Sequence, residues 1–136
     1  MATPVNVIAA LIRQGTKVLL VRKGGLLQLP GGKRSDGETS IACLRREVRE
    51  QVPVVAIVGV PEHWRVFKDL ISPRSGHRIT VSVYKVKIRW RDDGAVRTES
   101  ESVTEELWWQ GSMNVDDLTE PTQHILQEAG ILKQSR

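Results

Sequence analysis

The chain has 136 residues, enough for one domain with a hydrophobic core and too few for two ordinary domains, so we expect a single domain over residues 1–136. Hydrophobic residues make up 40% and charged residues 26% of the sequence, which excludes a disordered or fibrous chain. The net charge of +4 comes from scattered basic residues, a pattern typical of a solvated surface and compatible with a polyanionic ligand such as a nucleotide.

Cysteine content and hydropathy bear on the cellular compartment. The single cysteine, Cys43, cannot form an internal disulfide, which favours a reducing cytoplasm and excludes a zinc site built from cysteines. No stretch approaches the roughly 20 apolar residues that span a bilayer. We therefore expect a cytoplasmic protein without a membrane partner.

The N-terminal part of the chain predicts three β-strands. Residues 5–12 and 17–22 are rich in β-forming residues and flank Gly15, which suits a hairpin turn, so the two runs should pair antiparallel. Residues 26–29 should form a short strand that ends at the proline that follows. Residues 30–32 should then turn, and the two glycines of this turn allow the backbone to approach a ligand closely.

Residues 39–52 predict an α-helix. Four aliphatic residues fall within roughly 60 degrees of one another on a helical wheel and should face the core: Ile41, Leu44, Val48 and Val52. Thr39 or Ser40 can cap the start of the helix. Pro53 gives a workable stop, because proline disfavours helical geometry in the residue before it.

The neighbouring face of this helix carries oxygen-bearing side chains. Glu47, Glu50 and Gln51 lie within roughly 100 degrees of one another. Carboxylates on successive turns can hold hard cations such as Mg²⁺ or Mn²⁺, and a water bound to such a cation is a better nucleophile. The backbone carbonyl of Gly31 or Gly32 could add a neutral ligand. The alternative interpretation is an ordinary amphipathic helix with weak surface ion pairs.

Strands are again predicted in the middle of the chain. Residues 54–60 and 64–67 should be strand segments broken at Pro61, and residues 77–90 a longer strand. The apolar alternation of this longer strand changes phase near residues 84–85, which predicts a β-bulge there.

The C-terminal part is more polar. Residues 91–106 should be a loop, residues 107–110 a last short strand, and residues 120–129 a helix that ends at Gly130. The adjacent tryptophans at 108 and 109 should point to opposite faces of their strand, so that one packs in the core and the other covers the sheet or stacks on a base.

Six residues around the predicted helix match a known motif in type and spacing: Gly32, Glu38, Arg46, Glu47, Val48 and Glu50. The segment from Gly32 to Val54 resembles the Nudix box, Gly-x5-Glu-x7-Arg-Glu-U-x-Glu-Glu-x-Gly-U with U aliphatic, and the Leu-Pro-Gly before it matches the family's usual lead-in. Two positions depart from the pattern, since Gln51 replaces a third clustered glutamate and Pro53 replaces the closing glycine.

The resemblance implies an α/β fold, a Nudix-like α/β/α sandwich with a mixed β-sheet flanked by helices. It also implies a hydrolase that uses Mg²⁺ or Mn²⁺ to cleave a phosphoanhydride bond in a nucleoside diphosphate linked to another moiety, that is, a nucleotide pyrophosphohydrolase. Catalysis of this kind depends largely on neutralising phosphate charge and positioning the attacking water.

The resemblance also assigns roles to individual residues. Glu47 and Glu50 would be metal ligands, with Glu50 the better candidate for positioning or deprotonating the water, and Arg46 would orient a carboxylate with Glu38 as its partner. Gln51 could still ligate a cation through its amide oxygen. It brings no negative charge, so we expect weaker metal affinity or one metal fewer.

Family members commonly draw one more glutamate from the region before the last strand. Of the acids between residues 99 and 106, Glu101 is the first candidate by position and Glu105 the second. The alternative for either residue is a solvated loop acid.

A different hypothesis keeps the fold and loses turnover. The departures at Gln51 and Pro53 are compatible with a catalytically weakened module that binds or senses nucleotides. RNA binding is supported by net charge alone, without a basic stripe or an ordered aromatic motif, so nucleic acid is not an expected partner. We expect a small-molecule nucleotide as the substrate and a monomer or homodimer as the assembly. No signature in the sequence selects one nucleotide.

Overall fold

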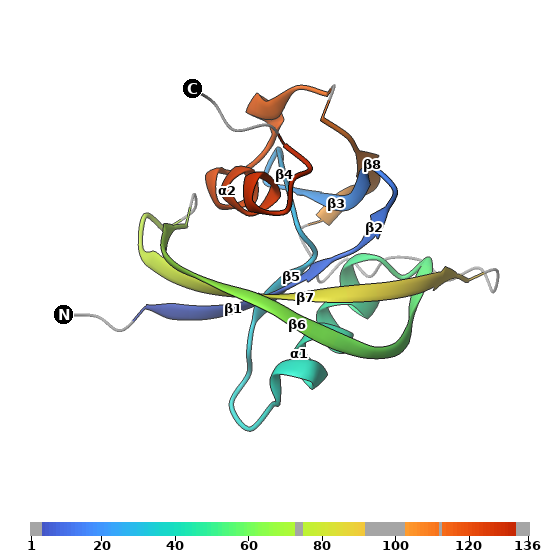
Figure 1. Cartoon of the computed structure of the whole chain (residues 1–136). Coiled ribbons are helices and arrows are strands. Elements are labelled where there is room, and N and C mark those ends of the chain that lie inside the picture. Colours follow the sequence, from blue (N-terminus) through green and yellow to red (C-terminus); the bar gives the residue numbers. More distant parts are fainter. Residues whose placement is uncertain (1–3, 73–74, 92–102, 112, 133–136) are drawn as a thin grey trace.

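A computed structural model describes residues 4–72, 75–91, 103–111 and 113–132 (Figure 1). Along the chain the elements are β1 (Val5–Leu11), β2 (Arg13–Gln14), β3 (Lys17–Lys23), β4 (Leu26–Gln28), β5 (Gly31–Lys33), α1 (Ser40–Gln51), β6 (Val55–Ile71), β7 (Arg78–Trp90), β8 (Val103–Trp109), the 3-10 helix η1 (Val115–Asp117) and α2 (Glu120–Glu128). None of the helices in these described ranges is long and apolar enough to cross a lipid bilayer.

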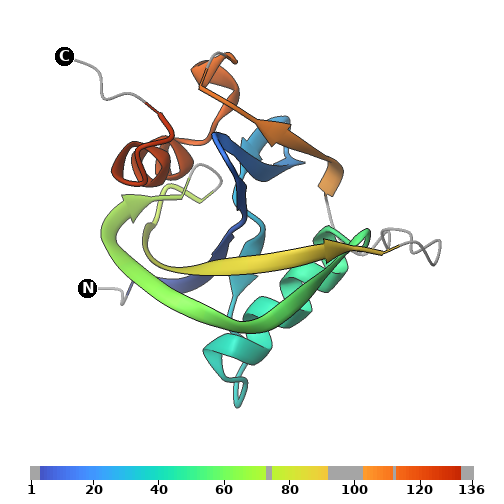
Figure 2. The same ribbon diagram turned by 45° about the vertical axis from the view of Figure 1, so that its right-hand side comes forward.

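Two four-stranded sheets form the centre of the fold. In the first, the order is β5-β1-β7-β6, and β1 and β7 run parallel whereas the other neighbours run antiparallel. In the second, β3 pairs antiparallel with β2, β4 and β8. Helix α1 packs on one side of the β layer and α2 on the other (Figures 1 and 2). The expected α/β class, with a mixed sheet flanked by helices, is confirmed.

β1 lies between two hydrophobic cores. Ile8 and Ala10 pack in the core that contains α1, whereas Ala9 and Leu11 pack in the core that contains α2. Successive side chains of a strand point to opposite faces, so a strand covered on both faces is apolar at every position rather than at alternate ones. This explains the unbroken apolar run in the sequence.

The predicted hairpin between residues 5–12 and 17–22 is wrong for most of its length. β1 leaves it and pairs with β5 and β7. Only the short β2 pairs with β3, around a turn at Gly15 with φ of 61°. The turn was therefore predicted correctly, but the partners of β1 are distant in sequence and leave no local signal.

The residues expected to form a turn at 30–32 lead into β5 instead. Gly31 lies opposite Ala9 in an antiparallel pair with β1. A Cβ atom on Gly31 would lie 2.1 Å from the carbonyl oxygen of Ile8, so only glycine allows the two backbones to come this close. The start of the Nudix-box-like segment is thus part of the central sheet.

β6 and β7 form a long curved ribbon at the edge of the first sheet (Figure 2). Pro61 does not divide the strand as predicted, and β6 runs from Val55 to Ile71. β6 is an edge strand, where a missing N–H can face away from the ladder. The bulge predicted near residues 84–85 is present as a shift of register, but its extra residues lie on β6, between Val58 and Glu62 and again between His63 and Arg65.

Helix α1 follows its sequence pattern closely. The Thr39 hydroxyl caps the first turn by accepting a hydrogen bond from the Ala42 N–H, and the helix ends at Gln51, just before Pro53. Of the aliphatic residues predicted to face the core, three are buried and one is partly buried: Leu44, Val48, Val52 and, in the second class, Ile41.

The C-terminal elements differ from prediction mainly at β8. This strand begins at Val103, four residues before the predicted start at residue 107. The prediction missed these residues because residues 104–106 are polar and do not show the apolar alternation of a strand. Part of the predicted loop at 91–106 lies outside the described residues. Helix α2 ends at Glu128, close to the predicted end, and Gly130 follows with φ of 75°.

Candidate active site

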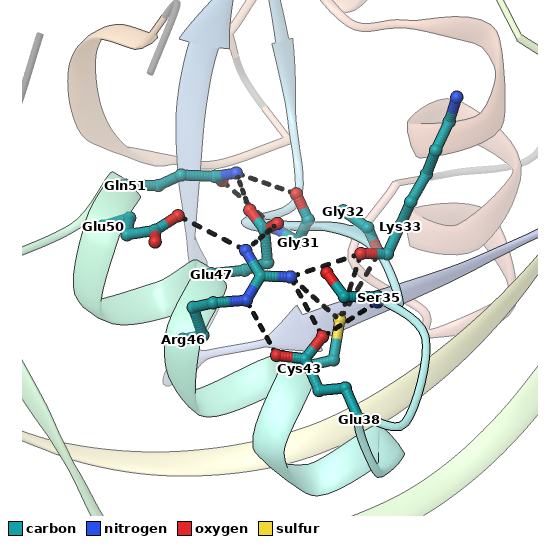
Figure 3. A network of polar contacts seen from close by, with 10 residues as sticks. All are labelled: Gly31, Gly32, Lys33, Ser35, Glu38, Cys43, Arg46, Glu47, Glu50 and Gln51. Atoms are coloured by element: carbon teal, nitrogen blue, oxygen red, sulfur yellow. Dashed lines mark hydrogen bonds and ion pairs between the residues drawn. The ribbon is translucent and has the colours of Figure 1, made fainter. Parts of the chain in front are cut away.

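Arg46, in the middle of α1, is the centre of a polar network between this helix and the preceding β5 and loop (Figure 3). Its Nε and Nη2 atoms donate to the two carboxylate oxygens of Glu38 at 2.8 and 3.1 Å. Its Nη1 atom donates to Glu47 at 2.9 Å and to Glu50 at 3.4 Å, and Nη2 also reaches the Lys33 carbonyl oxygen at 3.3 Å. One guanidinium therefore connects the three glutamates of the motif.

The Arg46–Glu38 pair is strongly charged. Hydrogen bonds from Arg46, and next from the Ser35 N–H, lower the pKa of Glu38 to about 2. The same contact with Glu38 is the largest cause of a raised pKa at Arg46. Bidentate arginine–carboxylate pairs fix orientation as well as charge. The structure thus places Glu38 where it pairs with the guanidinium, and the orienting role that the resemblance implies for this pair stays a prediction.

Glu47 lies deeper than the other acids, with 7% of the residue exposed. Burial is the largest cause of its raised pKa, and the contact with Arg46 acts in the opposite direction. Its carboxylate lies directly against Gly32, where a Cβ atom would come within 2.6–2.9 Å of the carboxylate atoms. Gly32 therefore leaves the space that the Glu47 carboxylate fills.

Gln51 is fully buried and both ends of its amide contact protein atoms. Its Oε1 atom accepts a hydrogen bond from the Gly31 N–H at 3.1 Å. Its Nε2 atom donates to the Gly31 carbonyl oxygen at 2.8 Å and to Oε2 of Glu47 at 2.7 Å. Each of these two oxygens accepts one hydrogen bond in this arrangement and has a second lone pair, so metal ligation by Gln51 or the Gly31 carbonyl stays a prediction.

A cavity of about 550 Å³ opens beside this network, between β1, β5, β7 and α2. Its formally charged lining residues lie at the motif end, since Lys33 is on β5, Arg46 and Glu47 are on α1, and Lys23 is close enough to Glu47 to act on its pKa. Its walls are aliphatic, and the remaining polar lining residues are neutral amides and hydroxyls together with His77. Glu50 is not among the residues that line the cavity as the structure describes it.

The donors near Glu47 are oxygens, which suit Mg²⁺ or Mn²⁺. Among the described residues, no three His, Cys, Asp or Glu side chains stand together as a ready metal site. A carboxylate offers about four lone-pair directions, so Glu47 and Glu50 retain acceptor capacity beyond their contacts with Arg46. Mg²⁺ commonly keeps several waters and uses one or two protein carboxylates. The pair therefore fits a hard cation of this kind.

Glu105 and Glu106, which were expected before the last strand, lie within β8 and point to opposite faces of it. Glu101 lies outside the described residues. Glu105 on β8 forms an ion pair with Arg22 on the paired strand β3. Leu107, two residues further along β8 and on the same face, packs against the α2 core. Glu106 lies opposite Val21, which packs in the α1 core, so the register turns Glu106 toward the layer of the motif helix.

Glu106 was among the acids considered from the sequence, but Glu101 and Glu105 were ranked before it by position. The adjacent tryptophans at 108 and 109 could have indicated the face on which Glu106 lies. Trp109 is fully buried in the α2 core, whereas Trp108 packs against the α1 core and makes an edge contact with Trp90 at 6.1 Å between ring centroids. Counting back two residues from Trp108 along a strand places Glu106 on the same face.

The comparisons with known proteins agree with this geometry. The family model described as NUDIX domain matches residues 2–134. The MutT NUDIX hydrolase from Burkholderia pseudomallei has a similar structure, with a TM-score of 0.74 at 21% identity over 93% of this chain and 98% of that one. The dihydroneopterin triphosphate pyrophosphohydrolase of E. coli gives a TM-score of 0.64 at 15% identity, covering 93% and 97% of the two chains.

A bifunctional NMN adenylyltransferase/ADP ribose pyrophosphatase from Francisella tularensis, complexed with AMP and a manganese ion, gives a TM-score of 0.66 at 17% identity. The similarity covers 95% of this chain and 42% of that larger one. Among curated proteins, none matches the sequence significantly. These structural similarities concern the fold, and the family model covers nearly the whole chain. The chain belongs to the NUDIX family.

Proposed function

We propose that the protein is a divalent-metal-dependent hydrolase that cleaves a phosphoanhydride bond in a nucleoside diphosphate linked to another moiety. The products are a nucleoside monophosphate and either pyrophosphate or a phosphorylated remainder. The observation that carries this proposal is the cavity whose charged lining residues gather at the motif end. There Lys23 and Lys33 add two positive charges to Arg46 and Glu47, and these lysines suit the phosphates of a substrate.

The rest of the cavity suits the uncharged part of such a substrate. Aliphatic residues of β1 and β7 form its walls, and hydroxyl groups of Thr119 and Thr122 lie on the α2 side. A pocket of about 550 Å³ is within the usual range for a nucleotide-sized ligand. The charge difference between the two ends would orient the ligand with its phosphates toward Glu47.

Each motif residue has a distinct role in this proposal. When bound, Mg²⁺ or Mn²⁺ would neutralise phosphate charge and make a bound water more acidic. Glu47 and Glu50 would hold the cation. Glu50 would also receive the proton of the attacking water, since its side chain is 30% exposed against 10% for Glu47 and its contact with Arg46 is long, at 3.4 Å. Arg46, anchored by Glu38, would keep both carboxylates oriented.

Glu106 is the additional acid that we propose for this site, in place of Glu105. Its position opposite Val21 turns it toward the α1 layer, whereas Glu105 pairs with Arg22 on the other side. Glu101 remains a prediction, because it lies outside the described residues.

Two related structures support the substrate class and the metal. One is a dihydroneopterin triphosphate pyrophosphohydrolase, and another holds AMP and a manganese ion. Both fit a site that combines carboxylates for a hard cation with lysines for phosphate.

The test is turnover on a panel of nucleotides with Mg²⁺ or Mn²⁺. The panel should contain nucleoside triphosphates, oxidised nucleotides, ADP-ribose, nucleotide sugars and dinucleoside polyphosphates, with release of phosphate products as the measurement. Glu50→Gln is the inactive control, because it keeps the size of the side chain and removes the base. Full activity of Glu50→Gln would refute the assigned mechanism while leaving the family intact.

A second candidate function is nucleotide binding without turnover, which the neutral Gln51 favours because it gives the site one carboxylate less. In that case no nucleotide of the panel yields product, yet at least one raises the Tm of the protein. A nucleotide that is both hydrolysed and stabilising excludes this alternative.

A further inference from the structure

The side-chain amide of Gln51 bridges two acceptor oxygens, one on the backbone of Gly31 and one on the Glu47 carboxylate. The Gly31 carbonyl oxygen and Oε2 of Glu47 lie 2.8 and 2.7 Å from the same Nε2 atom. The neighbouring Oε1 atom faces the Gly31 N–H. The surroundings also fix which end of the amide is which, because two acceptors face one end and a donor faces the other.

We propose that Gln51 is a positioning residue whose amide nitrogen takes the place of a cation between the Gly31 carbonyl and the Glu47 carboxylate. Position 51 then contributes no metal ligand. Glu47 is held in its orientation before any metal or substrate arrives, and the cation of the proposed hydrolase is bound by Glu47 and Glu50 without Gln51. The role of Glu47 as a metal ligand in this inference rests on the proposed function, whereas the contacts of Gln51 are given by the structure itself.

Only an amide satisfies all of these contacts without an ion. A glutamate at position 51 would place a second carboxylate against Oε2 of Glu47 in a buried site, on the side of Glu47 that Arg46 does not contact, where the two like charges would repel each other. It would also remove the donor to the Gly31 carbonyl. An apolar side chain of similar length would leave the Gly31 N–H, the Gly31 carbonyl and Glu47 each short of one hydrogen bond.

The same contacts join the end of α1 to the sheet. Gly31 pairs with Ala9 of β1 along one edge of β5, and the Gln51 amide binds both backbone groups of Gly31. Gln51 therefore satisfies Gly31 in the way that a neighbouring strand would. A buried side chain that bonds both backbone groups of one residue fixes the distance between helix and loop, which is what Glu47 needs in order to face the cavity.

The experiment compares the wild type with Gln51→Glu and Gln51→Met, and uses Gln14→Glu on the exposed β2 as the control for added charge. Two quantities are measured without substrate: Tm in EDTA and in Mn²⁺, and the number of Mn²⁺ ions bound per chain by electron paramagnetic resonance. We expect Gln51→Glu to melt lower than the wild type in EDTA, to recover in Mn²⁺ and to bind one more Mn²⁺ ion. Gln51→Met should melt lower in both conditions and bind no additional ion.

The proposal is refuted if Gln51→Glu melts like the wild type in EDTA, or if it binds no more Mn²⁺ than Gln14→Glu. A measurement on the wild type alone keeps the proposal testable if a variant does not fold. The side-chain NH₂ protons of Gln51 should exchange slowly with solvent and keep their NMR shifts during a Mg²⁺ titration. Loss of this protection on adding Mg²⁺ would show that Gln51 turns to the metal. None of these measurements needs turnover, so the proposed activity and this inference can fail separately.

Discussion

Gly32→Ala is the substitution that most directly perturbs the Glu47 carboxylate. The new methyl group would lie 2.6–2.9 Å from the carboxylate atoms, closer than carbon and oxygen atoms approach without displacement. A glutamate carboxylate normally moves aside at little cost. Here it is bonded on one side to Arg46 at 2.9 Å and on the other to Gln51 at 2.7 Å, so displacement breaks at least one charged hydrogen bond.

The expected size of the effect follows from these contacts. Overfilling a packed site costs about 1–3 kcal/mol, and replacing glycine returns about 0.4–1 kcal/mol through the entropy of the unfolded chain, so the middle of these ranges is a fall of about 1.3 kcal/mol in the free energy of unfolding. For 136 residues this corresponds to a Tm lower by about 4–5 °C. Loss of a hydrogen bond to a charged group costs about 1.5–3 kcal/mol, which lowers kcat/KM by about 10- to 100-fold if it occurs at Glu47.

The assay is a double-mutant cycle with Glu47→Asp, read by thermal unfolding and by steady-state hydrolysis. Aspartate is one methylene shorter and leaves room for the new methyl group. Gly32→Ala should therefore cost less stability in the Glu47→Asp background than in the wild type, with a coupling of about 0.5–2 kcal/mol. Additive losses would show that the methyl group does not meet Glu47 and would refute the reasoning, as would a Gly32→Ala protein with wild-type Tm and kcat/KM.

Other substitutions test the rest of the network. Arg46→Lys loses the paired contact with Glu38 and should lower kcat by about 10- to 100-fold in steady-state assays, because a point charge cannot hold Glu38 and Glu47 together; unchanged kcat would contradict this. The pKa of Glu38 is about 2 against an ordinary 4.5, so its pairing stabilises the fold above pH 4.5 and is lost as the pH falls toward 2. The Tm of Glu38→Gln should thus fall less than that of the wild type between pH 4.5 and 2, and parallel curves of Tm against pH for the two proteins would exclude the effect. Glu106→Gln should lower kcat at least about tenfold, whereas Glu105→Gln should stay within about twofold, since an exposed ion pair contributes only about 0–1 kcal/mol; the reverse order would refute the assignment by strand register.

Local patterns in the sequence predicted the motif helix well. Its apolar spacing, the Thr39 cap and the stop near Pro53 are all properties of neighbouring residues, and the structure follows them. The family resemblance also implied a pair of Glu38 and Arg46, and the structure brings them to 2.8 Å. These features depend on contacts within one helix and its preceding loop, which is why sequence alone carried them.

Features that depend on distant segments could not be read in this way. The pairing of β1 with β7 joins residues far apart in the chain, and the place of β6 at the edge of its sheet decides that Pro61 is tolerated. The orientation of Gln51 depends on Gly31, twenty residues earlier. The direction of Glu106 depends on the register of β8 against β3.

The close approach of Gly31 to β1 has a consequence for how the protein melts. Gly31 lies on β5, a short strand that pairs with β1 on one side and is bonded to the buried Gln51 of α1 on the other. A strand held on both sides has no low-energy way to open by itself, so it belongs to the same cooperative unit as the central sheet. Hydrogen exchange at the Gly31 amide should therefore report global unfolding rather than local breathing, and heat should remove activity and tertiary structure at one temperature.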